Sequence, residues 1–137
     1  MTNIEELYEM FLSKITDYKF LTLIDEEIED EMFKYFKSAR AKFYRCRNSL
    51  EVVDKKIQSD LTYYEIEVLV ALMLVEYITP KLISGENMSQ SLSDKDFKIY
   101  SQANQLREIR LLLNSMEAKA ERMMTTYTYF GIEKEKM

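Results

Sequence analysis

The sequence predicts an all-α protein: a small helical bundle of about four helices with a long C-terminal helix and an extended aromatic tail. Turn residues are scarce, because the 137 residues include only 2 glycines and 1 proline. Sandwiches and barrels need a turn about every 8–12 residues, so this scarcity disfavours an all-β fold. An apolar fraction of 47% and an aromatic fraction of 12% are too high for a disordered chain. A chain of this length suits one domain with a modest core.

The first half of the chain contains two predicted helices. Asn3 is the expected N-cap of a helix over residues 4–14. A second helix is expected over residues 24–45, because apolar side chains such as Ile28, Met32 and Phe36 recur at four-residue steps. Its acidic residues fill positions 25–31 and its basic residues follow over 34–47. This order complements the helix dipole, and it could also pair acidic and basic segments of adjacent copies.

The third predicted helix is the buried centre of the bundle. Thr62 and Glu65 form a capping-box pattern at its start, and its middle is apolar all round. Pro80 is expected to mark a kink or the end of the regular part, and Gly85 is expected to close the helix near residue 84.

The segments between these helices have weaker patterns. Residues 16–23 show no helical period and predict a linker or a short extended piece. Residues 46–61 predict a connection, in which a short helical turn over 52–57 is one alternative.

The fourth predicted helix begins with Ser93 as N-cap and Asp96 as its capping partner, and it extends to about residue 128. A helix of that length exceeds the diameter of a domain of this size, about 30–35 Å. One end should therefore project beyond the domain and meet a partner.

The last residues predict a separate docking tail, so the chain divides into a bundle over 1–126 and a tail over 127–137. Residues 125–132 abandon good helix formers for β-branched and aromatic residues. Exposed aromatic side chains are common at interfaces, so Tyr127, Tyr129, Phe130 and Ile132 are candidate docking residues for a partner. Packing of this tail on its own domain is the alternative.

Charge and composition disfavour several classes of function. A net charge of −5 disfavours binding that depends on neutralising nucleic-acid phosphates. The longest apolar run, 68–75, is far shorter than the roughly 20 residues that cross a bilayer, and the first residues lack the basic start of a signal peptide. We therefore expect a soluble protein with no membrane contact. The single cysteine, Cys46, excludes an internal disulfide and fits a reducing compartment.

We also expect no enzyme, no metal and no cofactor. The chain has no histidine, so neither a Ser-His nor a Cys-His nucleophile exists. Cys46 falls on the apolar stripe of the second helix, where a free cysteine is usually a small buried hydrophobe. The acidic run at 25–31 could suggest a carboxylate metal site, but a solvated face that complements the helix dipole explains it better.

Several short motifs in the second half match one known family. They are Leu72-Met73, Glu76-Tyr77-Ile78, Pro80-Lys81-Leu82, the segments 92–97 (LSDKDF) and 100–106 (YSQANQL), and Tyr127-Thr128-Tyr129. Through these motifs, residues 66–130 resemble the small helical neck proteins of tailed bacteriophages. The segments SDKDF and YSQAN are the most specific, whereas the first 60 residues match only in helical character.

The resemblance implies a structural virion protein, a head–tail connector adaptor. Such adaptors form a homo-oligomeric ring, typically of twelve copies, between the portal protein and the head-closure (stopper) or tail proteins. The implied place is the neck of the virion, after assembly in the host cytoplasm, with DNA passing through the ring but no sequence-specific DNA binding. A small helical regulatory or interaction protein that binds a single partner is the alternative.

One uncharged stretch inside the fourth helix fits such an assembly. Residues 101–105 carry no charge, although charged residues make up 31% of the chain. Small and amide side chains can exchange hydrogen bonds across a subunit boundary, where unpaired charges would be costly to desolvate. The candidate subunit-interface residues are Tyr100, Ser101, Gln102, Ala103, Asn104 and Gln105. An ordinary polar face that lacks charge is the alternative.

Overall fold

The computed structural model contains four helices and three very short strands. It describes the backbone of residues 1–15, 25–91 and 96–136, and the side chains of 1–15, 28–80 and 107–130. The helices are α1 (Ile4–Lys14), α2 (Asp25–Lys42), α3 (Tyr63–Ser91) and α4 (Asp96–Lys136). The strands are β1 (Thr2–Asn3), β2 (Val52–Val53) and β3 (Lys56–Ile57). The prediction of a mostly helical bundle with a long C-terminal helix is confirmed.

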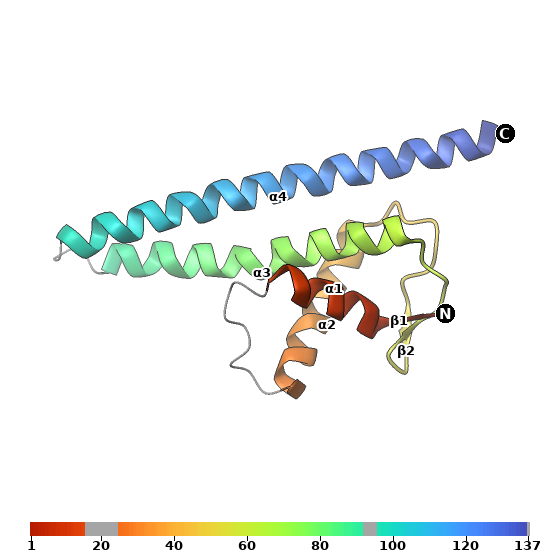
Figure 1. Cartoon of the computed structure of the whole chain (residues 1–137), viewed down its shortest axis with the longest axis horizontal. Helices are drawn as coiled ribbons and strands as arrows, with labels where there is room; N and C mark the ends of the chain where they lie inside the picture. The colour runs from red at the N-terminus through yellow and green to blue at the C-terminus, as the bar shows by residue number, and fades with distance from the viewer. Residues whose placement is uncertain (16–24, 92–95, 137) are drawn as a thin grey trace.

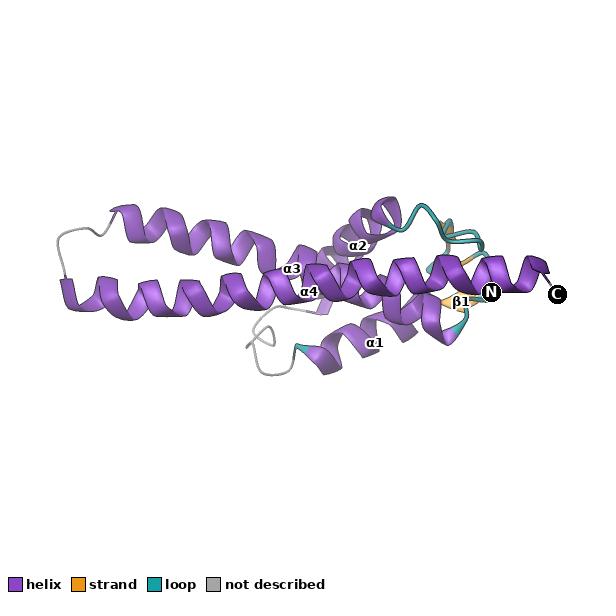
Figure 2. Ribbon diagram, turned by 90° about the horizontal axis from the view of Figure 1, so that it is seen from above, coloured by secondary structure: helices purple, strands orange, loops and turns teal. Residues whose placement is uncertain are grey.

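The helices form layers around α3. Helices α3 and α4 run antiparallel and side by side, while α1 and α2 pack on the side of α3 that faces away from α4 (Figures 1 and 2). Helix α4 has 41 residues, which corresponds to about 60 Å at 1.5 Å per residue. In Figure 1 both ends of α4 extend past α1 and α2. The prediction that this helix outruns the rest of the bundle is therefore confirmed.

Helix α3 supplies the centre of the core, as its apolar composition predicts. Its residues from Val68 to Val75 are all buried, and Tyr77 and Ile78 continue the buried segment. Helix α1 contributes Phe11, whose ring packs edge-on against Tyr77 with 5.8 Å between centroids. The start of α1 also follows its sequence pattern, because the Asn3 side chain accepts a hydrogen bond from the Glu5 N–H.

The connection between α2 and α3 contains a β-hairpin where a helical turn was one alternative. Strand β3 lies between β1 and β2 and pairs with both in antiparallel register, with Ile57 opposite Thr2 and Val52. The turn residues Asp54 and Lys55 have φ of 50° and 61°. Both φ signs match a type I′ turn, which normally selects asparagine and glycine, so the sequence lacks the usual hairpin signal here.

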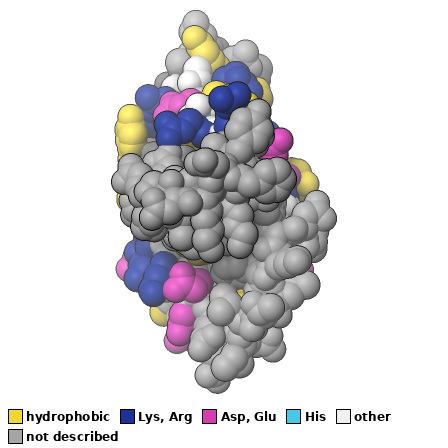
Figure 3. All heavy atoms as spheres, turned by 90° about the vertical axis from the view of Figure 1, so that its left-hand side faces the viewer, with side chains coloured by type: hydrophobic (Ala, Val, Ile, Leu, Met, Phe, Trp, Pro, Cys, Tyr) yellow, Lys and Arg dark blue, Asp and Glu magenta, His cyan; other side chains and the backbone are white. Residues whose placement is uncertain are grey.

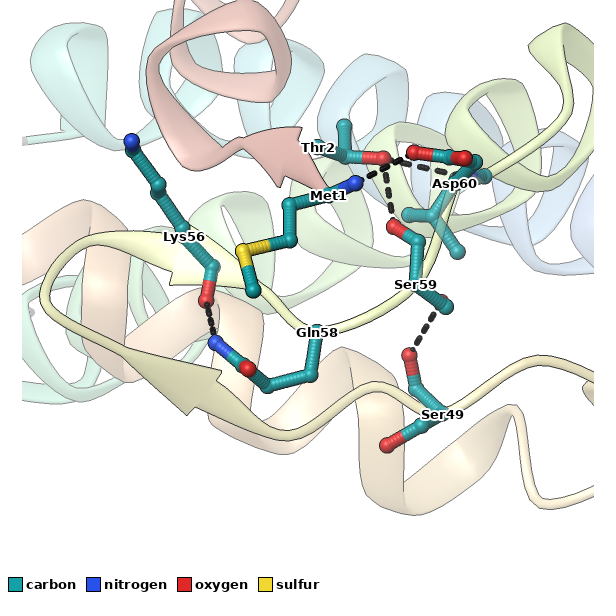
Figure 4. Close-up of polar contacts among 8 residues, drawn as sticks. Met1, Thr2, Ser49, Lys56, Gln58, Ser59 and Asp60 are labelled. Carbon is teal, nitrogen blue, oxygen red and sulfur yellow. Dashed lines mark hydrogen bonds and ion pairs between the residues drawn. The ribbon is translucent and has the colours of Figure 1, made fainter.

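Side-chain contacts fasten the N-terminal strand to the hairpin (Figure 4). The Thr2 hydroxyl donates to the Ser59 carbonyl at 2.8 Å and accepts from the Leu61 N–H at 2.9 Å. The Ser59 hydroxyl donates to the Ser49 carbonyl at 2.6 Å, and the Met1 amino group contacts Asp60. These contacts place the start of α1 beside the hairpin.

Two predicted helix ends are wrong. Helix α3 continues through Pro80 and Gly85 to Ser91. Gly85 does not have the positive φ of a helix C-cap. An interior glycine costs a helix only about 1 kcal/mol, which adjoining helical turns offset. Helix α2 ends at Lys42, three residues before the predicted end. The predicted linker at 16–23 and the Ser93 cap lie outside the described residues.

The prediction of an extended aromatic tail is also wrong. Residues 127–136 continue α4 without a break. Local β propensity is a weak preference, and tertiary packing of Tyr127 against the bundle overrides it. The backbone therefore has no boundary between residues 126 and 127.

Candidate interaction surface

Helix α4 presents one narrow stripe to the bundle. Leu113, Ala120, Met124 and Tyr127 are buried, and steps of three, four and seven residues place them on one face. This inner stripe packs against α3.

The opposite face of α4 is uncovered over its described length. Steps of three and four residues define an outer stripe of exposed residues, namely Leu111, Ser115, Ala118, Arg122, Thr126 and Tyr129. Leu111 and Tyr129 are each 62% exposed, an unusual cost for large apolar side chains. Arg122 is the only charged residue of this outer stripe. A low-charge helix face with exposed apolar side chains is typical of a surface that contacts another protein.

The C-terminal half of α4 is held on the bundle by a buried carboxylate, Glu65, which is 1% exposed. One of its oxygens, Oε1, accepts from the Thr62 N–H at 2.8 Å and from the Asn48 amide at 2.7 Å. The other, Oε2, accepts from the Tyr127 hydroxyl at 2.6 Å and the Cys46 thiol at 3.3 Å. These residues form the Glu65 cluster. Four donors satisfy the acceptor capacity of a carboxylate, so burial leaves no lone pair unpaired.

The hydrogen bonds of the Glu65 cluster also decide its protonation. Burial acts to raise the pKa of Glu65, but the hydrogen bonds from Tyr127, Thr62, Asn48 and Cys46 together outweigh it and hold this pKa below its usual value. Burial and the neighbouring carboxylate raise the pKa of the Cys46 thiol to about 11. Glu65 is thus ionised and Cys46 is a thiol at neutral pH, which suits a structural cluster better than nucleophilic chemistry.

Tyr127 makes the closest contacts between α4 and the segment that follows α2. Its hydroxyl accepts from the Arg47 backbone N–H at 2.9 Å, and its carbonyl accepts from the Arg47 guanidinium at 3.2 Å. That guanidinium lies 4.0 Å from the centroid of the Tyr127 ring. The Tyr127 ring also packs edge-on against the ring of Phe43, with 5.1 Å between centroids.

The four predicted docking residues therefore separate into different environments. Tyr127 is 2% exposed and binds its own domain, which corrects its assignment as a docking residue of a free tail. Tyr129 and Phe130 are 62% and 44% exposed, and Phe130 touches Tyr64 edge-on at 5.5 Å. Both remain candidates for a partner. The side chain of Ile132 lies outside the described residues.

The predicted subunit interface, residues 100–105, lies in the first turns of α4. The side chains of these residues lie outside the described residues, so the interface assignment stays a prediction.

The separated charges of α2 are partly used within the chain. Ion pairs join Lys34 to Glu31 at 3.3 Å and Lys55 to Glu29 at 3.5 Å. A further pair joins Lys42 to Glu76 of α3 at 2.5 Å. For the charged residues of α2 that form none of these ion pairs, pairing between acidic and basic segments of adjacent copies stays a prediction.

The Glu65 cluster could not be found from the sequence beyond its capping box. Glu65 at the third position of α3 was the one signal, because it is a carboxylate just before the apolar segment 68–75, which is buried. Cys46, Asn48 and Tyr127 lie 17 or more positions away in the chain. Only the fold brings them together.

No protein-family model, no curated protein and no solved structure matches the chain. Among the described residues, no three histidine, cysteine or acidic side chains are grouped closely enough to hold a metal ion. None of the described helices is both long and apolar enough to cross a membrane.

Proposed function

We propose that the protein is a non-enzymatic head–tail connector adaptor, which forms a ring between the portal and the head-closure or tail proteins of a tailed bacteriophage. The motifs in residues 66–130 suggest this family, and one structural observation supports it. The outer stripe of α4 is exposed along the described part of a helix about 60 Å long. A stripe with this composition favours contact between whole helices of adjacent copies.

The position of the uncovered surface favours a ring over a two-fold dimer. Helix α4 lies on one side of α3, while α1 and the hairpin lie on the other (Figure 1), and the outer stripe is on the exposed face of α4. When two different faces of one chain meet, the contact repeats from copy to copy and either closes into a ring or continues as a filament. Ring closure around DNA is the arrangement that an adaptor needs.

The docking role in this proposal belongs to the end of α4. Tyr129 and Phe130 lie two and three residues beyond Tyr127, which holds the helix on its own domain. They are thus presented on a supported helix rather than on a free tail. We propose that they contact the portal, because aromatic side chains presented rigidly lose little entropy on binding.

Electron microscopy of the purified protein, alone and with portal protein, tests this function. We expect closed rings, of about twelve copies if the family resemblance holds, on portal or at micromolar concentration. Tyr129→Ala combined with Phe130→Ala should leave circular dichroism unchanged and weaken attachment to portal. A protein that stays monomeric and ignores portal, but binds one other protein, would replace this proposal with the single-partner regulator.

A further inference from the structure

A cavity lies between α1, the start of α2 and the hairpin, on the side of the bundle that faces away from α4. Its volume is about 320 Å³. Two aromatic side chains, Tyr8 and Phe33, and four carboxylates form much of its wall; the carboxylates are Glu5, Glu29, Asp30 and Asp54. The one basic side chain that lines the cavity is Lys55, whose ammonium forms an ion pair with Glu29 at 3.5 Å. The cavity therefore favours a positively charged occupant.

Tyr8 gives the cavity a hydroxyl group that no other described residue hydrogen-bonds. The side chain is only 8% exposed, and its hydroxyl hydrogen-bonds to none of the described residues. Burial, followed by the charges of Glu29 and Asp30, raises the pKa of Tyr8 to about 12, so the hydroxyl lies near the acidic wall. Buried hydroxyl groups are normally hydrogen-bonded, and one that lines a cavity is available to a ligand.

The aromatic part of the wall suits a planar cation. The ring of Phe33 already attracts the Lys37 ammonium, which lies 5.1 Å from its centroid. A guanidinium can stack on such a ring while its N–H groups donate to carboxylates and to a hydroxyl oxygen. It is also more weakly hydrated than an ammonium, so less is lost when it enters a cavity.

Within the described part of the chain, one exposed guanidinium, that of Arg122, is available to a second copy. Arg122 is exposed at the centre of the outer stripe of α4, and no described residue forms an ion pair or hydrogen bond with it. Ala118 and Thr126, one turn on either side, are small enough to let this face approach another molecule. In the end view of Figure 3, Lys and Arg side chains and acidic side chains appear together on both the upper and the lower part of the molecule, so such a contact depends on individual charges rather than on a whole charged face.

We propose that the cavity receives the Arg122 guanidinium of a second copy of the chain. The guanidinium donates to the carboxylates of Asp30 and Glu29 and to the Tyr8 hydroxyl oxygen, and Phe33 packs against its plane. Helix α4 and helix α1, which lines the cavity, lie on opposite sides of α3 (Figure 1). Since the outer stripe is on the exposed face of α4, one copy cannot bring its own Arg122 to its own cavity, and the contact repeats from copy to copy. This inference rests on the proposed function in one respect, that the chain associates with itself.

A charge swap tests the contact. Arg122→Asp and Asp30→Arg should each weaken self-association on the order of 10- to 100-fold, measured by sedimentation velocity at constant ionic strength. The double variant should recover most of the loss, because the two charges still meet with opposite sign. Both residues are exposed in the single chain, so circular dichroism should show unchanged folding.

Two further variants make the test specific. Arg110→Asp changes the same charge at an exposed position of the same helix, about 100° around the helix from the adjacent stripe residue Leu111, and it should alter association little. Arg122→Lys keeps the charge but not the planar fork, and it should fall between the wild type and Arg122→Asp.

The outcomes separate this inference from the proposed function. If rings form but Arg122→Asp behaves as Arg110→Asp does, or the double variant recovers nothing, the contact assigned to the cavity is wrong and the ring stands. If the wild-type chain remains monomeric both alone and with portal, the ring and this contact fall together.

Discussion

A single carboxylate, Glu65, ties together three segments that are distant in the chain. Its donors come from the segment after α2, from the start of α3 and from α4. A buried charge adds little net stability compared with an apolar side chain, but removing one of its partners is costly. The Glu65 cluster thus fixes where α4 lies on the bundle more than it raises total stability.

The hydroxyl of Tyr127 should account for much of this positional control. Tyr127→Phe keeps the ring contacts but removes the donor to Glu65 and the acceptor for the Arg47 N–H. We expect a loss of about 1–3 kcal/mol in the free energy of unfolding, measured by urea denaturation. Tyr129→Phe removes the same atom from a 62% exposed residue and should change this free energy by less than about 0.5 kcal/mol. Equal effects of the two variants would mean that the buried hydroxyl contributes nothing.

The protonation of Glu65 predicts sensitivity to acid. Its folded-state pKa is lowered from the usual 4.5, so its contribution to stability is present above that value and is lost as the pH falls through the folded-state pKa. Glu65→Gln should be less stable than the wild type at pH 7, and the difference should shrink on acidification below about pH 4.5. Thermal unfolding from pH 7 to pH 3 measures it. Glu67 also has a lowered pKa, so some acid sensitivity remains in the variant. A constant difference between the two proteins across this range would contradict the assignment.

Among helices and strands, the hairpin departs furthest from its usual sequence. Asp54 and Lys55 both occupy the left-handed region, where a residue with a Cβ carries a cost of about 1–2 kcal/mol. The Lys55 carbonyl nevertheless accepts from the Ile4 N–H at 3.1 Å, which joins the turn to α1. The strained turn is therefore kept in place by the start of the first helix and by the strand pairs on each side.

Relieving this turn should stabilise the protein. Lys55→Gly replaces a residue with φ of 61° by one without a Cβ, and we expect a gain of about 0.5–1 kcal/mol in the free energy of unfolding. Its exposed ion pair with Glu29 offsets little of this gain. Lys56→Gly, one residue later in strand β3, should instead destabilise by a similar amount, because glycine weakens a strand. Chemical denaturation of both variants gives the comparison. A loss at both positions would show that the left-handed geometry carries no strain.

The starts of α1 and α3 and the end of α1 were predictable from the sequence, whereas the ends of α2, α3 and α4 were not. Asn3 and the pair Thr62 and Glu65 cap α1 and α3 as their patterns indicate, because a cap is made by residues a few positions apart. Gly85 sits inside α3, and the aromatic segment after residue 126 sits inside α4, since packing overrides weak local preferences. The hairpin was missed because its turn lacks asparagine and glycine.

At the scale of the whole molecule, the two faces of the bundle differ in charge. The cavity beside α1 carries four carboxylates, while the outer stripe of α4 carries a single charge, that of Arg122. The buried inner stripe of α4, which faces α3, follows from helical periodicity. The cavity was not predictable, because its wall combines α1, α2 and the hairpin.

Self-association should weaken as the salt concentration rises. The Debye length is about 8 Å at physiological ionic strength and shortens as salt is added. Added salt should therefore weaken the proposed attraction between the acidic cavity and Arg122. Raising the NaCl concentration from about 0.05 to 0.5 M should lower the association constant of the wild type more than that of Arg122→Asp. Light scattering at matched protein concentrations measures both. If the association constants do not change with salt concentration, the charges of α2 and α4 contribute only to solubility and to the helix dipole, not to the contact between copies.

The uncharged segment at 101–105 gives the last prediction, which separates assembly from folding. Ala103→Arg should disrupt assembly more than it disrupts the fold, because bulk and charge would enter a close contact between copies. Ala120→Arg is the matched control on the inner stripe of the same helix, where Ala120 is 2% exposed. It should lower the free energy of unfolding by several kcal/mol, because the charge would be buried against α3. Circular dichroism melts report the fold and light scattering reports assembly. If Ala103→Arg lowers the melting temperature as Ala120→Arg does and leaves assembly intact, residue 103 belongs to the core of its own chain.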